Sequence, residues 1–470
     1  MRQLLLCLCI GYTTFAHTQN IYDITAFGAV NSTAVISTAA IQQAINKCAA
    51  AGGGTVTVPP GNYTTGTITL ASNINLHLNA GAILHASANL EDYTVLPGVT
   101  NDNYKEGVKG LINCTNATNV SITGEGEINL HGETFIDRTK PPVFDTPVDS
   151  LQQSQGVVVM KERPNQLIFF SNCSNISVRD VKIINSPCMI LVMSNCDVVN
   201  IQGVYIDNNN LKIPNSDGIH LSGCKNVTLT NCRIFTDDDC IAVTSLVHYD
   251  DYSQNILIAN SVLESSSAGV RLGYLRSRVT NVILKGLIIN NSNRGIIISA
   301  GKGGYVKNVN VESCIIDAHI KVGRWWGNGE AIAMFRDDKV NAQGLFITTD
   351  TTNKYLDNIS FSNIQATSEN GIHIIAAPNN IRNIFFNNCS LTLVDSHNRP
   401  VAGSFYDIQP AGYRPRKPGT LAAIYADGVT NLYLNGVTVN NGLLKQHGLN
   451  ITTQLNHCIV KRNDITFTGN

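Results

Sequence analysis

Apolar and polar residues alternate along this chain in a short pattern that recurs at nearly even intervals. Each repeat opens with asparagine, then an apolar residue, any residue and a second apolar residue. From Asn175 to Asn308 the successive intervals are 25, 26, 29, 26 and 27 residues. Repeats of this length with short β-type runs predict a parallel β-helix, a solenoid whose turns stack on one another. The repeats begin at Asn119, Asn175, Asn200, Asn226, Asn255, Asn281, Asn308, Asn358, Asn383 and Asn431.

The repeated asparagine is expected at one corner of every coil, where it permits a tight turn and bonds its counterparts in a ladder. Two intervals are about twice as long, 50 residues from Asn308 to Asn358 and 48 from Asn383 to Asn431. We interpret each as one weakly marked coil with an added loop. Loops inserted in solenoids tend to line the binding face.

One helix is predicted before the repeats, over residues 37–51. Ile41, Ala44, Ile45 and Cys48 follow helical spacing and form its apolar face. A serine–threonine pair can cap its start, and three glycines follow its end. Because the first coil of a solenoid has an open edge, we expect this helix to cover it.

Length and charge narrow the class of protein. The 470 residues exceed one ordinary globular core, and a net charge of −1 with 14% charged residues argues against nucleic acid or an anionic membrane as partner. Residues 1–16 combine an arginine, a short apolar run and a final Ala16, which is typical of a secretory signal peptide. We expect residues 17–470 to form one secreted or periplasmic domain that acts as a monomer.

The cysteines indicate a core position. Of the 13 cysteines, Cys7 and Cys9 fall in the expected signal peptide, which leaves 11 without metal-type spacing. Cysteine behaves as a small buried apolar residue, so we interpret the repeated pairs as a stacked core position, while export leaves one or two disulfides open. Four of them follow asparagine in the same local pattern, at Cys173, Cys196, Cys232 and Cys389.

Two acidic motifs lie one repeat apart. Asn215-Ser216-Asp217 is followed, 21 residues after its aspartate, by Asp238 within Asp237-Asp238-Asp239. Neighbouring strands in stacked coils lie about 4.8 Å apart, so three carboxylates would converge on one cleft. Paired carboxylates in one site are the requirement for acid–base cleavage of a glycosidic bond.

The direction of these carboxylates is a difficulty for that interpretation. Strict β alternation puts Asp217 on the same side as Ile219, and Asp239 on the same side as Ile241, which would bury both in the core. An outward direction requires a bulge or a strand start close to each aspartate. The competing interpretation of residues 237–239 is a solvated acidic turn between strands.

At these motifs the chain resembles the polygalacturonases, the family 28 glycoside hydrolases. Residues 215–219, Asn-Ser-Asp-Gly-Ile, are similar to the family's N-T-D motif, and residues 238–241, Asp-Asp-Cys-Ile, to its D-D-C-I motif. The opening from Phe27 to Gly61 and the pair Arg163-Pro164 are also similar, so the resemblance covers residues 22–310. It implies an all-β, right-handed parallel β-helix and a glycoside hydrolase that acts on a polysaccharide without a cofactor.

The chain departs from the family at two motifs. Where polygalacturonases have G-H-G it has Ser267-Ala268-Gly269, and where they have R-I-K it has Ile297-Ile298-Ser299. The histidine and both cations that hold a galacturonate carboxylate are therefore absent. We expect a pectic substrate other than strict homogalacturonan. Three nearby cations could substitute: Arg271, Arg294 and Lys302.

The resemblance implies an inverting mechanism. By matched position, Asp238 is the acid that protonates the leaving oxygen, and Asp217 and Asp239 are the bases that activate water. Unequal roles agree with physical expectation, because repulsion in one cleft raises the pKa of one carboxyl and retains its proton.

Six further residues are candidates for substrate binding. The two tryptophans are the only ones in the chain and lie in a glycine-rich loop, where an indole can stack on a sugar ring. The alternative for the tryptophans is that one packed indole anchors the loop. For His220 the alternative is a structural role, and for Arg271 it is contact with solvent alone. No metal site is indicated. The candidates are His220, Arg271, Lys302, Arg324, Trp325 and Trp326.

Two other functions compete with hydrolysis. A polysaccharide lyase needs a base and usually a cation at the substrate carboxylate, and the missing cations disfavour it. A non-catalytic glycan-binding or adhesin-like β-helix remains open because a fold does not fix chemistry. The three preserved aspartates favour the hydrolase.

Overall fold

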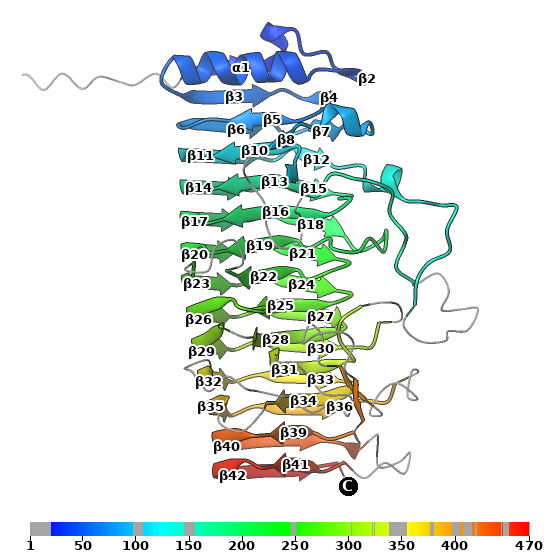
Figure 1. Ribbon diagram of the computed structural model, residues 1–470, viewed down its shortest axis with the longest axis vertical. Helices are drawn as coiled ribbons and strands as arrows, with labels where there is room; N and C mark the ends of the chain where they lie inside the picture. Colours follow the sequence, from blue (N-terminus) through cyan, green and yellow to red (C-terminus); the bar gives the residue numbers. More distant parts are fainter. Residues whose placement is uncertain are drawn as a thin grey trace, which may run out of the picture.

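The strands of the protein wind into a right-handed parallel β-helix (Figure 1), as the sequence predicts. The structure is a computed structural model. It describes residues 20–96, 107–144, 156–245, 251–301, 303–321, 323, 325–337, 355–376, 380–396, 405–407, 416–418, 421–442, 444 and 451–469. The expected signal peptide lies outside the described residues.

Each coil contributes one strand to each of three parallel arrays, which we call the first, second and third array in chain order. The first array contains β1 (Ile21–Asp23), β3 (Gly54–Val58), β6 (Ile74–Leu78), β11 (Thr118–Gly124), β14 (Ser174–Arg179), β17 (Asp197–Gln202), β20 (Lys225–Thr230), β23 (Ser253–Ala259), β26 (Arg278–Lys285), β29 (Tyr305–Glu312), β32 (Leu356–Ser362), β35 (Ile381–Asn387), β40 (Val429–Asn440) and β42 (Ile459–Thr468).

The second array pairs in the same order and joins the first where β40 spans both. It contains β2 (Ser32–Ile36), β4 (Gly61–Thr65), β7 (Ala82–Ala86), β12 (Glu127–Asn129), β15 (Lys182–Ile184), β18 (Tyr205–Asn208), β21 (Arg233–Thr236), β24 (Val262–Ser265), β27 (Ile288–Ser292), β30 (Ile315–Ala318), β33 (Gln365–Ser368) and β36 (Ser390–Leu393).

The third array is a separate 12-stranded sheet and carries the acidic motifs at the beginnings of its strands. It contains β5 (Ile68–Leu70), β10 (Ile112–Thr115), β13 (Gln166–Ser171), β16 (Met189–Ser194), β19 (Ile219–Ser222), β22 (Ile241–Thr244), β25 (Ala268–Leu272), β28 (Arg294–Gly301), β31 (Glu330–Asp337), β34 (Asn370–Ile375), β39 (Ile424–Asp427) and β41 (Thr453–Asn456).

Short elements lie outside the arrays. Two antiparallel pairs are formed by β8 (Val95–Leu96) with β9 (Val108–Lys109), and by β37 (Phe405–Asp407) with β38 (Arg416–Pro418). The 3-10 helices are η1 (Ile24–Phe27), η2 (Leu90–Asp92) and η3 (Gly132–Phe135).

The predicted helix is present as α1 (Thr38–Ala50), and it buries the four residues of the expected apolar face. In the first coil α1 follows β2, at the place where a third-array strand follows in later coils. The helix covers the N-terminal end of the solenoid (Figure 1). Its start differs from the expectation. The Ser37 hydroxyl accepts from the Val30 amide and that of Thr38 from the Gly66 amide, so neither side chain caps the helix.

The asparagine ladder forms at the start of first-array strands, where these residues adopt positive φ. The side chain of Asn281 donates to Asn255 (3.1 Å), and that of Asn308 donates to Asn281 (3.2 Å). One predicted member is wrong. Asn200 lies mid-strand, paired with Thr228, and the corner of its coil is Val198, with φ 54°.

The two long intervals do not contain an extra coil. β29 pairs directly with β32, and β35 pairs directly with β40. Each interval is therefore one coil enlarged by insertions, which corrects the interpretation drawn from the spacing.

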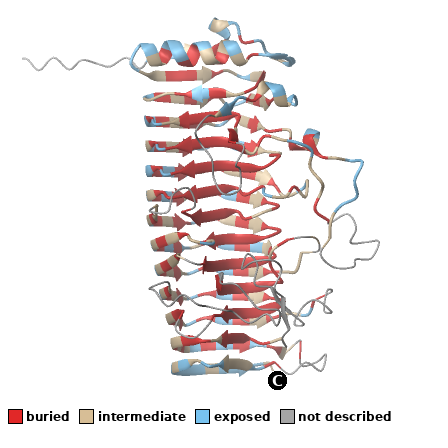
Figure 2. Cartoon of the chain, in the orientation of Figure 1, coloured by how far each residue is buried: buried red, intermediate tan, exposed pale blue. Residues whose placement is uncertain are grey.

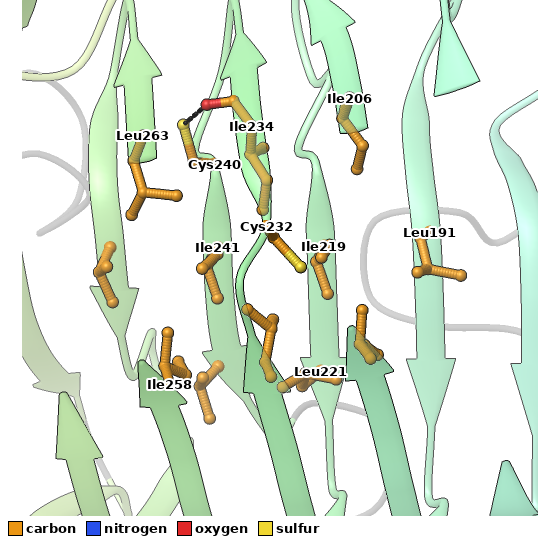
Figure 3. Packing of buried hydrophobic residues seen from close by; sticks show 14 of the residues in the cluster. Leu191, Ile206, Ile219, Leu221, Cys232, Ile234, Cys240, Ile241, Ile258 and Leu263 are labelled. Carbon is orange, nitrogen blue, oxygen red and sulfur yellow. Dashed lines mark hydrogen bonds between the residues drawn. The ribbon is translucent and has the colours of Figure 1, made fainter. Parts of the chain in front are cut away.

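The interior is a continuous stack of apolar side chains. Figure 2 shows buried residues in the strands of successive coils. Figure 3 shows rows of this stack: Leu191, Ile219 and Ile241 from the third array face Ile206 and Ile234 from the second. The 11 cysteines from Cys48 onward are free thiols and ten of them are buried, as expected for a stacked core position. None is in a disulfide. No described helix is long and apolar enough to cross a membrane.

Candidate active site

A change of side-chain direction at the start of each third-array strand turns the acidic motifs out of the core. Asp217 and Asp239 contact polar groups in a cleft, whereas the next two residues of each strand face inward. Gly218 occupies the first inward position after Asp217. A Cβ there would lie 2.6 Å from the carbonyl oxygen of Cys240, so a larger residue would clash. β19 and β22 then begin at Ile219 and Ile241, so strict alternation does not extend back to either aspartate.

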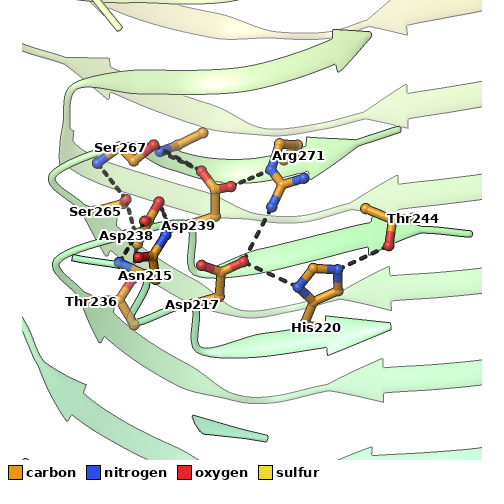
Figure 4. A network of polar contacts seen from close by, with 11 residues as sticks. Asn215, Asp217, His220, Thr236, Asp238, Asp239, Thr244, Ser265, Ser267 and Arg271 are labelled. Atoms are coloured by element: carbon orange, nitrogen blue, oxygen red, sulfur yellow. Dashed lines mark hydrogen bonds and ion pairs between the residues drawn. The ribbon is translucent and has the colours of Figure 1, made fainter. Parts of the chain in front are cut away.

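Asp217 and Asp239 lie on adjacent coils and share one guanidinium. Ile219 pairs with Ile241, which places the two aspartates opposite each other two residues earlier. Arg271, in the following coil, donates from Nη2 to Oδ2 of Asp217 (3.1 Å) and from Nε to Oδ2 of Asp239 (Figure 4). One guanidinium therefore pairs with both carboxylates and offsets half of their combined negative charge.

The remaining contacts of the two aspartates are unequal. Asp239 also accepts, at Oδ1, from the Ser267 hydroxyl (3.0 Å) and the Ala268 amide (3.1 Å). Oδ2 of Asp217 lies 3.2 Å from Nδ1 of His220. Both of these side-chain contacts of Asp217, from Arg271 and from His220, are therefore at Oδ2. Asp239 is thus fixed on both oxygens, and Asp217 by side chains on one.

Among the described residues, Asp238 accepts its side-chain hydrogen bonds from backbone amides. Its Oδ2 accepts from the Asn215 amide (3.1 Å) and its Oδ1 from the Asp239 amide (2.9 Å). Its neighbour Asp237 is fully buried and accepts from the Ile213 amide (2.9 Å) on the other side of the turn. Burial raises the pKa of Asp237 to about 6. A solvated acidic turn is therefore wrong for residues 237–239.

The carboxyls of the cleft differ in acidity. Burial and the negative charges of Asp217 and Asp239 raise the pKa of Asp238 well above its ordinary value. Burial also disfavours the ionised form of Asp217, but the His220 contact and the charge of Arg271 outweigh it, so its pKa is lowered. The two pKa values are therefore displaced in opposite directions, which favours the protonated form of Asp238 and the ionised form of Asp217.

The cleft has a volume of about 780 Å³ and is closed by two different walls. One wall is aromatic: the Tyr274 and Trp326 ring centroids are 6.1 Å apart, and Arg271 lies 5.5 Å from the Tyr274 ring. A second group of lining residues is aliphatic. It consists of Val143, Val157, Val158, Val159, Met160 and Met189.

Four of the six predicted binding residues line this cleft: His220, Arg271, Trp325 and Trp326. Arg324 and Lys302 lie outside the described residues. Arg294, considered as a substitute cation, is buried, with Nε 3.3 Å from Oε2 of Glu330, and it is not among the cleft residues. No group of three or more potential metal-ligating residues was found within the described ranges.

Comparison with known proteins assigns the chain to a family. Residues 48–398 match the family described as Glycosyl hydrolases family 28. The chain belongs to glycosyl hydrolase family 28. Membership confirms the predicted class, a glycoside hydrolase with a parallel β-helix.

Individual relatives are similar over part of the sequence. A probable polygalacturonase of Vitis vinifera is 28% identical over 63% of this chain, and the match spans 60% of that protein, less than two thirds of its length. An endo-polygalacturonase of Pectobacterium carotovorum subsp. carotovorum is 28% identical over 60% of this chain and 69% of its own. The solved family 28 exopolygalacturonase of Yersinia enterocolitica has a TM-score of 0.66 at 18% identity, covering 96% of this chain and 79% of that one, and this shows the shared fold.

Several cleft residues of this family 28 protein were missed from the sequence. Tyr274 follows a glycine at the end of a strand, and Arg163 was noted only as part of the resemblance. The run Val157 to Met160 lies between β12 and β13, where no repeat marks it. Four consecutive apolar residues outside the solenoid pattern were the available signal.

The two tryptophans have different roles in the geometry. Trp325 is only 5% exposed and anchors the loop, whereas Trp326 is half-buried beside Tyr274. We expect Trp326→Ala to raise KM about tenfold with a smaller change in kcat, because a stacking surface for sugar is lost. Trp325→Ala is the control and should instead lower the unfolding temperature. Equal KM for Trp326→Ala and the wild type would contradict stacking at this residue.

Proposed function

We propose that this chain is a secreted glycoside hydrolase that cleaves pectic polysaccharide with inversion, using Asp238 as acid and Asp217 with Asp239 to activate water. The observation that carries the proposal is the opposite displacement of two pKa values in one cleft: Asp238 raised, Asp217 lowered. A proton donor and an ionised base are both required at the same pH. Similarity to polygalacturonases supports a pectic substrate.

The contacts favour a division of labour between the two bases. The side-chain contacts of Asp217, from Arg271 and His220, are both at Oδ2, so Oδ1 is better placed to accept a proton from water. Asp239 has three donors on its two oxygens, so it is better suited to orient Arg271 and add negative charge. We assign the principal base to Asp217.

The same geometry disfavours a lyase. β-Elimination usually uses a cation at the substrate carboxylate, but the guanidinium of Arg271 is engaged by two aspartates of the protein. A protonated Asp238 beside an ionised Asp217 is suited to cleavage by hydrolysis. No described residue set suggests a cofactor.

The test is product analysis with purified protein and a panel of pectic polysaccharides. Proton NMR during the first minutes should show that the new reducing end has the opposite anomeric configuration to the cleaved bond. A product that retains configuration would contradict the inverting mechanism. Ultraviolet absorbance from an unsaturated end would identify a lyase, and binding without release of reducing sugar would favour a glycan-binding protein.

A further inference from the structure

The aliphatic wall of the cleft is built by an excursion of the chain between β12 and β13. Val157 pairs with Val143, and Met160 with Ile136, in isolated antiparallel bridges. The amide of Val158 donates to the carbonyl of Lys212 (3.0 Å), which ties the excursion to the loop that precedes Asp217. The wall is therefore fixed relative to the catalytic carboxylates.

The aliphatic wall is partly exposed to solvent. Val158, Val159 and Met160 are half-buried, although they lie in a connection rather than in the core. Apolar surface left in contact with water is unfavourable, and a contiguous apolar patch beside polar groups commonly marks a binding site. Met189 extends the patch, in the coil before Asp217.

The two arginines among the described lining residues are already engaged. Arg271 is neutralised by Asp217 and Asp239. Arg163 donates from Nη1 to the carbonyl of Pro187 and from Nη2 to that of Pro214 (3.0 Å). The described lining residues contain three carboxyl groups and these two cations. A substrate carboxylate would find neither an excess of positive charge nor an arginine free for bidentate pairing.

The positions aligned with the family's R-I-K motif point the same way. Ile297 belongs to an apolar cluster on the outer side of the third array, together with Ala268 and Phe335. Ser299 is fully buried. Neither can replace a cation that holds a carboxylate.

We propose that the cleft binds, next to the cleaved bond, an uncharged sugar ring that carries a methyl group, which packs on Met160, Met189 and the neighbouring valines. Such a ring is either a 6-deoxyhexose or a methyl-esterified uronate. This inference rests on the proposed hydrolase function and specifies its substrate. The aromatic wall supports the ring face, and the aliphatic wall selects the substituent.

Three substrates of matched chain length separate the possibilities: a polymer alternating 6-deoxyhexose with galacturonate, methyl-esterified homogalacturonan, and its de-esterified form. We expect kcat/KM for one of the first two to exceed that for the third by at least about tenfold, the scale of one or two methyl contacts. The better of the two identifies the source of the methyl group. Equal rates, or preference for the de-esterified polymer, would overturn the substrate class while leaving the hydrolase intact. Absence of cleavage of all three would instead count against the proposed function.

A single substitution tests the wall itself. Met160→Lys keeps an unbranched side chain of similar length but adds a cation. We expect it to reduce the preference for the methyl-bearing substrate at least fivefold, through KM. Ile283→Lys, at an exposed first-array position, is the matched control and should leave the preference unchanged. If Met160→Lys folds and its preference equals that of the wild type, the wall does not select the substituent.

Discussion

Asp238→Asn is expected to lower kcat about a thousandfold, the largest effect of any single substitution in the cleft. The asparagine cannot protonate the leaving oxygen, while its size and position are kept. The amide nitrogen also cannot accept one of the two backbone hydrogen bonds now made to Asp238, so a stability loss of about 1 kcal/mol should accompany it. Initial rates and thermal unfolding of the same preparation measure both effects.

The neighbouring carboxyl provides a matched control. Asp237 receives the same substitution one residue away, but it is fully buried, and its Oδ2 accepts from the Ile213 amide, as an asparagine oxygen still can. Its Oδ1 lies 3.5 Å from Nζ of Lys212, so the substitution removes this ion pair and should lower stability, whereas it removes no proton donor from the cleft. Asp237→Asn should therefore retain activity within about threefold of wild type, far less than the effect of removing a general acid. Similar activity losses in both variants would mean that the turn, rather than the proton of Asp238, is what matters.

Acid and base roles also predict the shape of the pH profile. Asp238 must be protonated, so activity falls as pH rises through its raised pKa. Asp217 must be ionised, so activity falls as pH decreases through its lowered pKa. The two displacements widen the interval between the limbs, and the residual activity of Asp238→Asn should lack the alkaline limb.

The fold could be predicted because its determinants are local and repeated. An asparagine at positive φ followed by alternating apolar residues opens most of the first-array strands. The pattern misleads where a coil departs from it. In the coil of β17 the corner residue is Val198, so the ladder has no asparagine side chain there. The side chain of Asp197 accepts the hydrogen bond from Asn226 instead (2.7 Å). Asn200, two residues later, was mistaken for the repeat.

The position of the acidic motifs was predictable, but the direction of their side chains was not. Strict alternation fails at the third-array corners because two successive residues face the core there. The first of these is small in many coils: Gly218, Gly269, Gly295, Ala331 and Gly371. Sequence periodicity contains no information on contacts between coils, so it also could not show that Arg271 pairs with both aspartates.

Arg271→Met is expected to produce the second large loss, about a hundredfold in kcat/KM at neutral pH, together with a loss of roughly 3 kcal/mol in the free energy of unfolding. Two buried carboxylates on adjacent coils would lose their shared cation. Asp217 and Asp239 would then repel each other, and the pKa of Asp217 would rise. The acid limb of the pH profile should move to higher pH, because more of the base is protonated at a given pH.

Arg271→Lys separates charge from geometry in the same site. An ammonium supplies the positive charge, but it cannot present the two guanidinium nitrogens that now contact the two aspartates. Relative to Arg271→Met, we expect the free energy of unfolding and the position of the acid limb to return most of the way to their wild-type values. We expect kcat to return less. If Arg271→Met loses stability but keeps the wild-type pH profile, the arginine is structural only. A shift of the acid limb of the pH profile would show that Arg271 keeps the base Asp217 ionised. Arg271 would do so beside Ala268, at the position where polygalacturonases have histidine.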